Sequence, residues 1–323
     1  ENKNTSDSLK VRQRADDLLR EIGAIAFARR GRHTPSAWEQ RLENFARSLA
    51  TDEYDQHRLL VESHTLADRD ANDAVVERVR MATRLKRWQK HPPSVPESMA
   101  GLAKLYRDDL SHVDRAIDAL TAGESLPSVT TAYRTLVERV REQRSKYDEA
   151  FAQFLSDEPS GVIPVENVID EVIAPIVRNG HPILLIVLDG CSWAIAHDLL
   201  TQLRSEHWQE LTLDESQEPP VPLLATIPSV TERSRVSLFA GKFHRGDASV
   251  EREVFSHQPK LLAECERRHP PILFHKAHVS EGSRGPLREE LNEAIRDEKK
   301  KIVGVVGIFA PRSRAEQDAE AKA

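Results

Sequence analysis

The chain has 323 residues, of which 39% are hydrophobic and 30% are charged, and its formal net charge at pH 7 is −6. That length predicts more than one domain, and so mild a charge gives no general electrostatic basis for binding nucleic acid or membranes. No apolar stretch approaches the roughly 20 residues of a membrane span, and the first residues lack the apolar core of a signal peptide. Two cysteines, Cys191 and Cys265, are too few for a disulfide framework. We therefore predict a cytoplasmic protein that does not associate with membranes.

Residues 1–158 are predicted to form a helical bundle domain. Apolar residues recur at helical spacing through this region, as Leu42, Phe45 and Leu49 do, and no glycine-rich or strand-like segment interrupts them. A bundle of about five helices is the most economical explanation.

Basic residues crowd one short span of this bundle around Trp88. They are Arg78, Arg80, Arg84, Lys86, Arg87 and Lys90. One interpretation is a surface that contacts a phosphate backbone. The other is a solvated helix face whose charge is balanced by acidic residues elsewhere, and the acidic net charge of the chain favours it.

Residues 159–180 are predicted to be a linker followed by a connecting helix. The run at residues 156–161 is polar and rich in turn-forming residues. Pro175 predicts a kink in the helix that follows, and Asn179-Gly180 predicts its end.

Strand and helix patterns alternate through residues 181–310. This predicts an α/β domain with a mostly parallel sheet that helices cover on both faces. The apolar run at residues 182–188 predicts a strand buried on both faces. Further elements are expected at 192–205 (helix), 211–213 (strand), 221–227 (extended), 231–241 (helix), 261–265 (helix), 272–274 (strand), 287–295 (helix) and 302–309 (strand). The polar residues 311–323 predict a disordered tail or a weak helix.

Asp189 follows the first of these strands, at the edge where open parallel sheets place their chemistry. A carboxylate there is typical of nucleotide-binding proteins, phosphatases and dehydrogenases, and also of simple turn or N-cap residues. Cys191 stands where a haloacid-dehalogenase phosphatase needs a second Asp, and Ala194 replaces the second Gly of a nucleophile elbow. Gly241-Lys242 lacks the earlier Gly of a P-loop.

Thr231 lies in the first turn of the helix that Gly241 is predicted to end. A hydroxyl there faces exposed backbone N–H groups and the positive end of the helix dipole, which favours a bound phosphate and the alkoxide of an attacking threonine. Arg233 and Arg235 are candidates for charge-assisted hydrogen bonds to phosphate oxygens. The alternative is that Thr231 only caps the helix and the arginines face solvent.

Two segments together resemble the PglZ domain, which belongs to the alkaline phosphatase superfamily. They are residues 187–193 (VLDGCSW) and residues 227–241 (IPSVTERSRVSLFAG). The long helical region before them is similar to that of PglZ proteins of bacterial BREX (phage growth limitation) defence systems, type 2 branch. The resemblance implies an alkaline-phosphatase-like fold for residues 181–310, of which this chain has the N-terminal half.

The resemblance also implies a role for each residue of the candidate site. In this superfamily an Asp after the first strand binds a divalent metal, usually Zn²⁺, and Asp189 matches it. A Thr or Ser at the start of a helix that ends in Gly is both the nucleophile and a metal ligand, and Thr231 matches it. The implied reaction is metal-dependent hydrolysis of a phosphate monoester or phosphodiester at a two-metal site.

The superfamily's remaining ligands, Asp and His residues on later strands, have no recognisable match here. The strand at residues 302–309 is followed by Ala310-Pro311 instead of acidic residues. His275 and His278 flank a strand end but lack a metal-ligand spacing. The metal site is therefore expected to be incomplete, and the chain to be a truncated or inactive relative.

Two function hypotheses remain open. The first is a PglZ-type component of a BREX anti-phage system, a hydrolase whose phosphoesterase domain is incomplete in this chain. The alternative is a non-catalytic scaffold that binds other subunits of the defence complex through its helical domain. The expected partners are other BREX proteins and a nucleotide or nucleic-acid phosphoester substrate.

Overall fold

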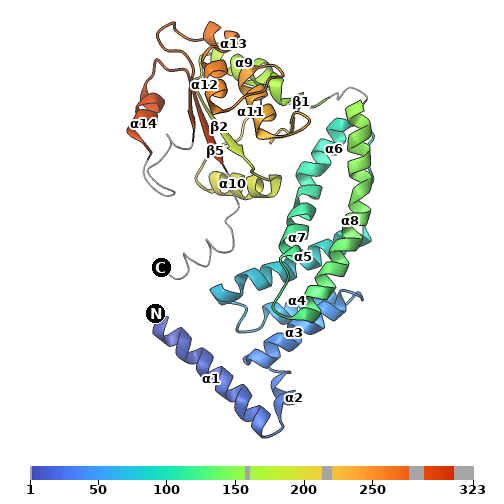
Figure 1. The fold of residues 1–323 in the computed structure, drawn as a ribbon. Coiled ribbons are helices and arrows are strands. Elements are labelled where there is room, and N and C mark those ends of the chain that lie inside the picture. Colours follow the sequence, from blue (N-terminus) through green and yellow to red (C-terminus); the bar gives the residue numbers. More distant parts are fainter. Residues whose placement is uncertain (1, 157–160, 213–219, 276–286, 309–323) are drawn as a thin grey trace. The chain divides into compact units, whose positions relative to one another are not determined.

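The computed structural model of the chain describes residues 2–156, 161–212, 220–275 and 287–308 (Figure 1). The chain divides into two compact units, Glu1–Glu158 and Pro159–Ala323. The described part is mixed α/β, and helices predominate in it. No helix in these ranges combines the length and apolar character needed to cross a lipid bilayer.

The regular secondary structure among the described residues of the first unit is all helical. Its helices are α1 (Asn2–Glu21), α2 (Ile25–Ala28), α3 (Pro35–Ser48), α4 (Tyr54–Glu62), α5 (Asp73–Lys90), α6 (Met99–Leu105), α7 (Ser111–Thr121) and α8 (Pro127–Ser156). A 3-10 turn at Asp70–Asn72 precedes α5, and a π-helical turn at Tyr106–Leu110 joins α6 to α7. One contiguous apolar core joins helices α3 to α8, with Phe45, Leu85 and Tyr133 fully buried in it. The predicted helical character of this region is confirmed.

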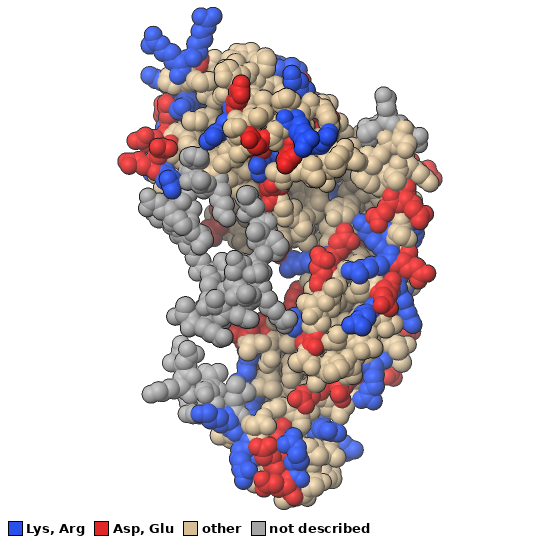
Figure 2. Space-filling model, in the orientation of Figure 1, with Lys and Arg blue, Asp and Glu red and all other residues tan. Residues whose placement is uncertain are grey.

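The basic residues around Trp88 lie on α5, and most of them are engaged in ion pairs. The pairs are Arg78–Glu124, Arg80–Glu62, Arg87–Asp55 and Lys90–Asp52. Acidic and basic side chains are interspersed over the face of the helical unit seen in Figure 2. Since each of these cations already faces a carboxylate, the structure favours the charge-balanced helix face over a surface that contacts phosphates.

His64 is the most deeply buried histidine described in the helical unit, with 1% of its surface exposed. Its Nδ1 accepts a hydrogen bond of 3.1 Å from the backbone N–H of Leu66, and the ring packs against Trp38. Burial, followed by the nearby charge of Arg41, lowers the pKa of His64 to about 4. His64 is therefore neutral at physiological pH, and it carries its hydrogen on Nε2.

The second unit contains two small parallel sheets among its helices. Its elements are β1 (Ile163–Pro164), a 3-10 turn (Val165–Asn167), a π-helical turn (Ile169–Ile173), α9 (Ala174–Arg178), β2 (Ile183–Asp189), α10 (Trp193–Ser205), β3 (Leu223–Leu224), α11 (Thr231–Ala240), α12 (Ala248–Ser256), α13 (Pro259–Ala263), β4 (Ile272–His275), α14 (Glu289–Arg296) and β5 (Ile302–Ile308). The larger sheet has the order β2-β5-β4, and the smaller one pairs β1 with β3.

The parallel register brings the carboxyl ends of the larger sheet's strands to one edge. Asp189, the last residue of β2, is paired with Ile308 of β5. His275, the last residue of β4, is paired with Val306 of the same strand. Asp189 and His275 therefore end their strands at the same edge of the sheet, although 86 positions (275 − 189) separate them in the sequence.

Helices cover the two faces of this sheet unequally (Figure 1). One face packs against α11, α12 and α13 through Phe239, Phe255 and Leu261, all fully buried. On the other face, Leu291 of α14 packs against β4 and β5. This second cluster contains no residue of β2 among the described residues.

The prediction that the first apolar strand is buried on both faces is wrong. Leu184, Ile186 and Leu188 are 42%, 57% and 39% exposed, while the alternate residues Ile183 and Leu185 pack against the core. The physical reason is position: β2 is an edge strand of the described sheet, and α14 covers only its neighbours. An apolar run shows that a strand can be buried on both sides, but burial also requires a covering layer.

Some predicted elements differ locally. The connecting helix of residues 159–180 is divided into a 3-10 turn, a π-helical turn and α9, and Pro175 lies in the first turn of α9 instead of kinking an interior. Leu211 and Thr212 are not in a strand. Leu287 precedes α14. Leu213, His278 and the predicted tail 311–323 lie outside the described residues.

Candidate active site at the carboxyl end of the sheet

Asp189 is placed by the end of β2 and by the turn that follows it. Gly190 has φ of 75°, a left-handed conformation that glycine adopts without steric cost, so the chain leaves the sheet directly after the carboxylate. The side chain of Asp189 is 30% exposed and accepts hydrogen bonds through Oδ2. A partly exposed carboxylate at this edge can both receive a proton and face a ligand.

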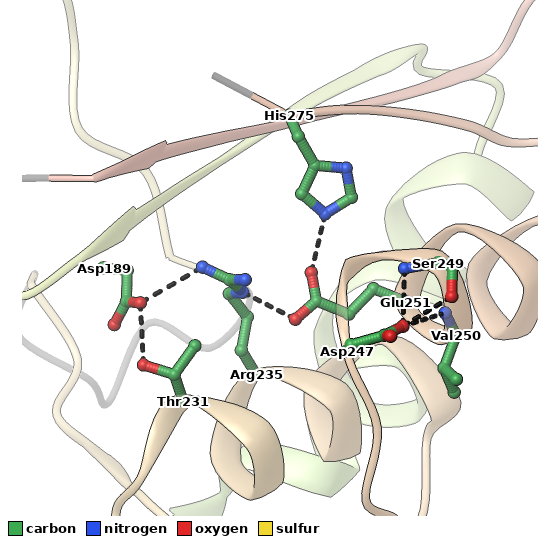
Figure 3. Close-up of polar contacts among 8 residues, drawn as sticks. All are labelled: Asp189, Thr231, Arg235, Asp247, Ser249, Val250, Glu251 and His275. Atoms are coloured by element: carbon green, nitrogen blue, oxygen red, sulfur yellow. Dashed lines mark hydrogen bonds and ion pairs between the residues drawn. The ribbon is translucent and has the colours of Figure 1, made fainter. Parts of the chain in front are cut away.

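Thr231 is the first residue of α11, and its hydroxyl is directed at Asp189. Thr231 Oγ1 donates to Asp189 Oδ2 across 3.0 Å, although the two residues are 42 positions apart (Figure 3). The N-cap position is Val230, and no side-chain cap bond forms there. The alternative that Thr231 only caps the helix is therefore wrong. Gly241, with φ of 64°, ends α11 as predicted.

Arg235 lies one helical turn after Thr231 and faces the same side. Its Nη1 donates to Asp189 Oδ2 at 3.1 Å, and its Nε donates to Glu251 Oε1 at 2.8 Å. The side chain is only 11% exposed. The sequence predicted Arg235 as a phosphate contact facing solvent or substrate, whereas the structure places its guanidinium between two carboxylates.

Arg233 is not brought to this group. Its guanidinium lies over the ring of Phe243, 5.5 Å from the ring centroid. Residues two apart on a helix point in nearly opposite directions, so Arg233 and Arg235 cannot both face Asp189. Of the two predicted phosphate contacts, only Arg235 is adjacent to Asp189 and Thr231.

Two further residues belong to the same hydrogen-bonded group, and sequence reasoning did not assign them a role in it. Glu251 on α12 is 1% exposed. Its Oε2 lies 2.7 Å from His275 Nε2, while its Oε1 accepts from Arg235. His275 was noticed for its position near a strand end, but Glu251 had no signal in the sequence. Its partners come from a strand and a helix that only the folded chain brings together.

Asp247 fixes the start of α12 and hence the position of Glu251. Its side chain accepts from the backbone N–H groups of Ser249 and Val250 at 2.9 and 3.2 Å (Figure 3). A hydrogen bond from the Ser249 hydroxyl, with these backbone donors, lowers the pKa of Asp247. Glu251 follows in the first turn, and its N–H donates to the carbonyl of Asp247 at 3.0 Å.

The donors at the site fit part of a divalent-metal ligand set. Asp189 offers a carboxylate and Thr231 a hydroxyl, which are hard oxygen ligands suited to an ion that also keeps water and phosphate ligands. Within the described residues, no group of three or more His, Cys, Asp or Glu side chains is arranged to hold a metal. A zinc site closed by protein ligands alone needs more donors than these two.

Comparison with known proteins adds no narrower class to this coarse description. No protein-family model matches the sequence, and no curated protein matches it. What the fold and the site define is a helical unit followed by a mixed α/β unit, with an Asp–Thr–Arg group at the carboxyl end of a parallel sheet. Any narrower function has to be argued from the chemistry of that group.

Proposed function

We propose that the α/β unit carries a metal-dependent phosphoesterase site of the alkaline phosphatase superfamily type, in a PglZ-type protein of a bacterial BREX anti-phage system. The observation that supports it most is the 3.0 Å hydrogen bond from Thr231 to Asp189 at the carboxyl end of β2. These residues belong to the two segments whose sequence resembles PglZ domains. The proposal includes an alkaline-phosphatase-like fold for residues 181–310.

The proposed chemistry begins with Thr231. Its oxygen attacks the phosphorus of a phosphate ester, and Asp189 is placed to accept the hydroxyl proton because the hydrogen bond between them already exists. A bond from Thr231 Oγ1 to phosphorus forms, and the bond from phosphorus to the ester oxygen breaks. The departing oxygen takes the proton that Asp189 accepted. Water then attacks the phosphothreonine, which releases phosphate (or a phosphate monoester from a diester) and returns a proton to Thr231 Oγ1.

A divalent metal, Zn²⁺ in the proposal, would be held in part by Asp189 and Thr231. When bound, such an ion stabilises negative charge and favours the alkoxide of a coordinated hydroxyl. The start of α11 adds the positive end of a helix dipole next to Thr231, which favours a phosphate there. Arg235 has N–H donors beyond the two described contacts and remains a candidate phosphate contact. Arg233 is a weaker one, since it lies over Phe243.

The proposed substrates are phosphate monoesters or phosphodiesters, including nucleotide esters, and the proposed partners are other BREX proteins in the cytoplasm. The test is hydrolysis of an aryl phosphate and of a diaryl phosphate with added Zn²⁺ or Mn²⁺. We expect Thr231→Ala and Asp189→Asn to lower the rate by about a hundredfold or more, the effect of losing a catalytic group.

A matched control is Thr201→Ala. Thr201 is an exposed threonine of α10 whose hydroxyl donates to a backbone carbonyl of its own helix. Its loss should leave the rate unchanged. Equal rates in the unaltered chain, Thr231→Ala and Asp189→Asn would remove the catalytic proposal.

The second candidate is a non-catalytic scaffold that binds other subunits through its helical unit. The small number of metal-capable side chains at Asp189 within the described residues favours it. It predicts that binding to defence-complex subunits persists in Thr231→Ala and in the presence of a chelator. Co-purification with and without chelator separates the two candidates, because the phosphoesterase alone requires metal.

A further inference from the structure

Glu251 is a buried carboxylate that lies outside the Asp189–Thr231 pair but is connected to it. Only 1% of its surface is exposed. A carboxylate removed from water needs hydrogen-bond partners and compensating charge, since an unpaired one is strongly unfavourable in a protein interior. Arg235 contacts one oxygen of Glu251 and His275 contacts the other.

The contact with His275 fixes how the charges are distributed. An ionised carboxylate only accepts hydrogen bonds, so His275 Nε2 carries the hydrogen that Glu251 receives. His275 Nδ1 is buried without a partner among the described residues. The guanidinium of Arg235, which is always charged, lies 2.8 Å from the other oxygen of Glu251 and supplies a compensating positive charge.

Arg235 connects Glu251 to the candidate site through two different nitrogens. Nε binds Glu251, and Nη1 binds Asp189. Since the guanidinium is planar and rigid, fixing Nε also fixes the direction of Nη1. The side chain has little freedom to rearrange, because it is only 11% exposed.

We propose that Glu251, oriented by His275, is a positioning residue that holds the Arg235 guanidinium against Asp189 and offsets its charge. The group Asp189–Arg235–Glu251 then carries one excess negative charge, which stays available at Asp189. Without Glu251, Arg235 would neutralise Asp189. The consequence for cation binding rests on the proposed function, whereas the positioning of Arg235 does not.

The first test uses the metal-free chain. Hydrogen exchange of the Arg235 Nε–H is measured by NMR, with the signal assigned by its loss in Arg235→Lys. We expect Glu251→Ala to speed this exchange by about tenfold or more, and Glu251→Gln to retain slow exchange because an amide oxygen still accepts the bond. Glu253→Ala is the matched control, since Glu253 is an exposed acidic residue of the same helix. Equal exchange in Glu251→Ala and Glu253→Ala would overturn the positioning role.

The second test separates charge from position by titration with Mn²⁺ alone, followed by electron paramagnetic resonance of the free ion. We expect Glu251→Gln to weaken binding by about tenfold, and the double variant Glu251→Gln/Arg235→Gln to recover most of that loss. A double variant as weak as Glu251→Gln, or a Glu251→Gln affinity equal to that of Glu253→Gln, would overturn the charge offset.

Failure of the proposed function gives a different result. If the unaltered chain and Asp189→Asn bind Mn²⁺ equally, Asp189 is not a metal ligand and the metal-dependent proposal fails. The exchange of the Arg235 Nε–H then decides the positioning role alone.

Discussion

The ion pair of Arg80 on α5 with Glu62 lies at the surface of the helical unit, whereas the pair of Arg235 and Glu251 is buried in the α/β unit. Arg80 of α5 has a side chain that is 57% exposed, against 11% for Arg235 and 1% for Glu251. Surface pairs mainly balance charge at little gain in stability. A buried pair is costly to assemble, because both charges are removed from water. In the α/β unit this buried pair also contacts Asp189, whose side chain is 30% exposed at the edge of the sheet.

The largest effect that sharpens this comparison is expected from Arg235→Gln. It leaves the buried carboxylate of Glu251 without its charged partner, so we expect the free energy of unfolding of the α/β unit to fall by roughly 3–5 kcal/mol. Arg80→Gln, the same change on α5, should cost about 1 kcal/mol or less. Denaturant unfolding of both variants measures the difference. Similar losses in the two variants would break the comparison.

The helical unit buries a titratable side chain, His64, that is neutral at physiological pH. The pKa of His64 is about 4 in the folded chain, below the ordinary value, so folding opposes its protonation. The contribution of neutral His64 to the free energy of unfolding is complete above about pH 6.5, the pKa of an unfolded histidine. It is lost as the pH falls toward 4, by roughly 3 kcal/mol in total. Unfolding followed across this range should show that loss in the unaltered chain and a smaller one in His64→Gln.

The control for this pH dependence is His91→Gln, since His91 is an exposed histidine that follows α5. It should keep the pH dependence of the unaltered chain. An unchanged dependence in His64→Gln would show that His64 is not the group responsible.

A smaller effect tests the unequal covering of the sheet. A Cβ at Gly304 of β5 would lie 2.6 Å from Leu273 Cδ1 and 3.1 Å from Phe255, on the face packed by α12. We expect Gly304→Ala to destabilise the α/β unit by about 1–3 kcal/mol through overpacking. Gly307→Ala on the same strand meets the exposed Leu188, 3.2 Å away, which is free to move. It should cost clearly less, and equal costs measured by denaturant unfolding would contradict the difference between the faces.

Local patterns predicted much of the fold. The hydroxyl-rich start and the glycine end of α11 predicted Thr231 and Gly241 as its limits, and the apolar runs predicted β2, β4 and β5 within one or two residues. These features depend on neighbours in sequence, so one sequence is enough to find them.

The helices that cover the sheet, and the residues that contact Asp189 and Arg235, could not be predicted from local patterns. Whether Leu184 and Ile186 are covered depends on which helix lies over β2. The role of Glu251 depends on β4 and α11 lying against α12. The charge of Arg235 is balanced by Glu251 and Asp189, which lie 16 and 46 positions away in the sequence. The sequence predicted both Arg233 and Arg235 as phosphate contacts, and only the direction of each side chain on α11 distinguishes them.

The central claim is that the hydroxyl of Thr231 and the carboxylate of Asp189 act as one reactive pair. Its most direct test is acid quenching of the chain during turnover of an aryl phosphate with Zn²⁺ or Mn²⁺, followed by peptide mass spectrometry. The account predicts a phosphoryl group on Thr231 that is absent in Asp189→Asn and unaffected in Thr201→Ala. Turnover with no phosphoryl group on Thr231, or with the same labelling in Asp189→Asn, would contradict it.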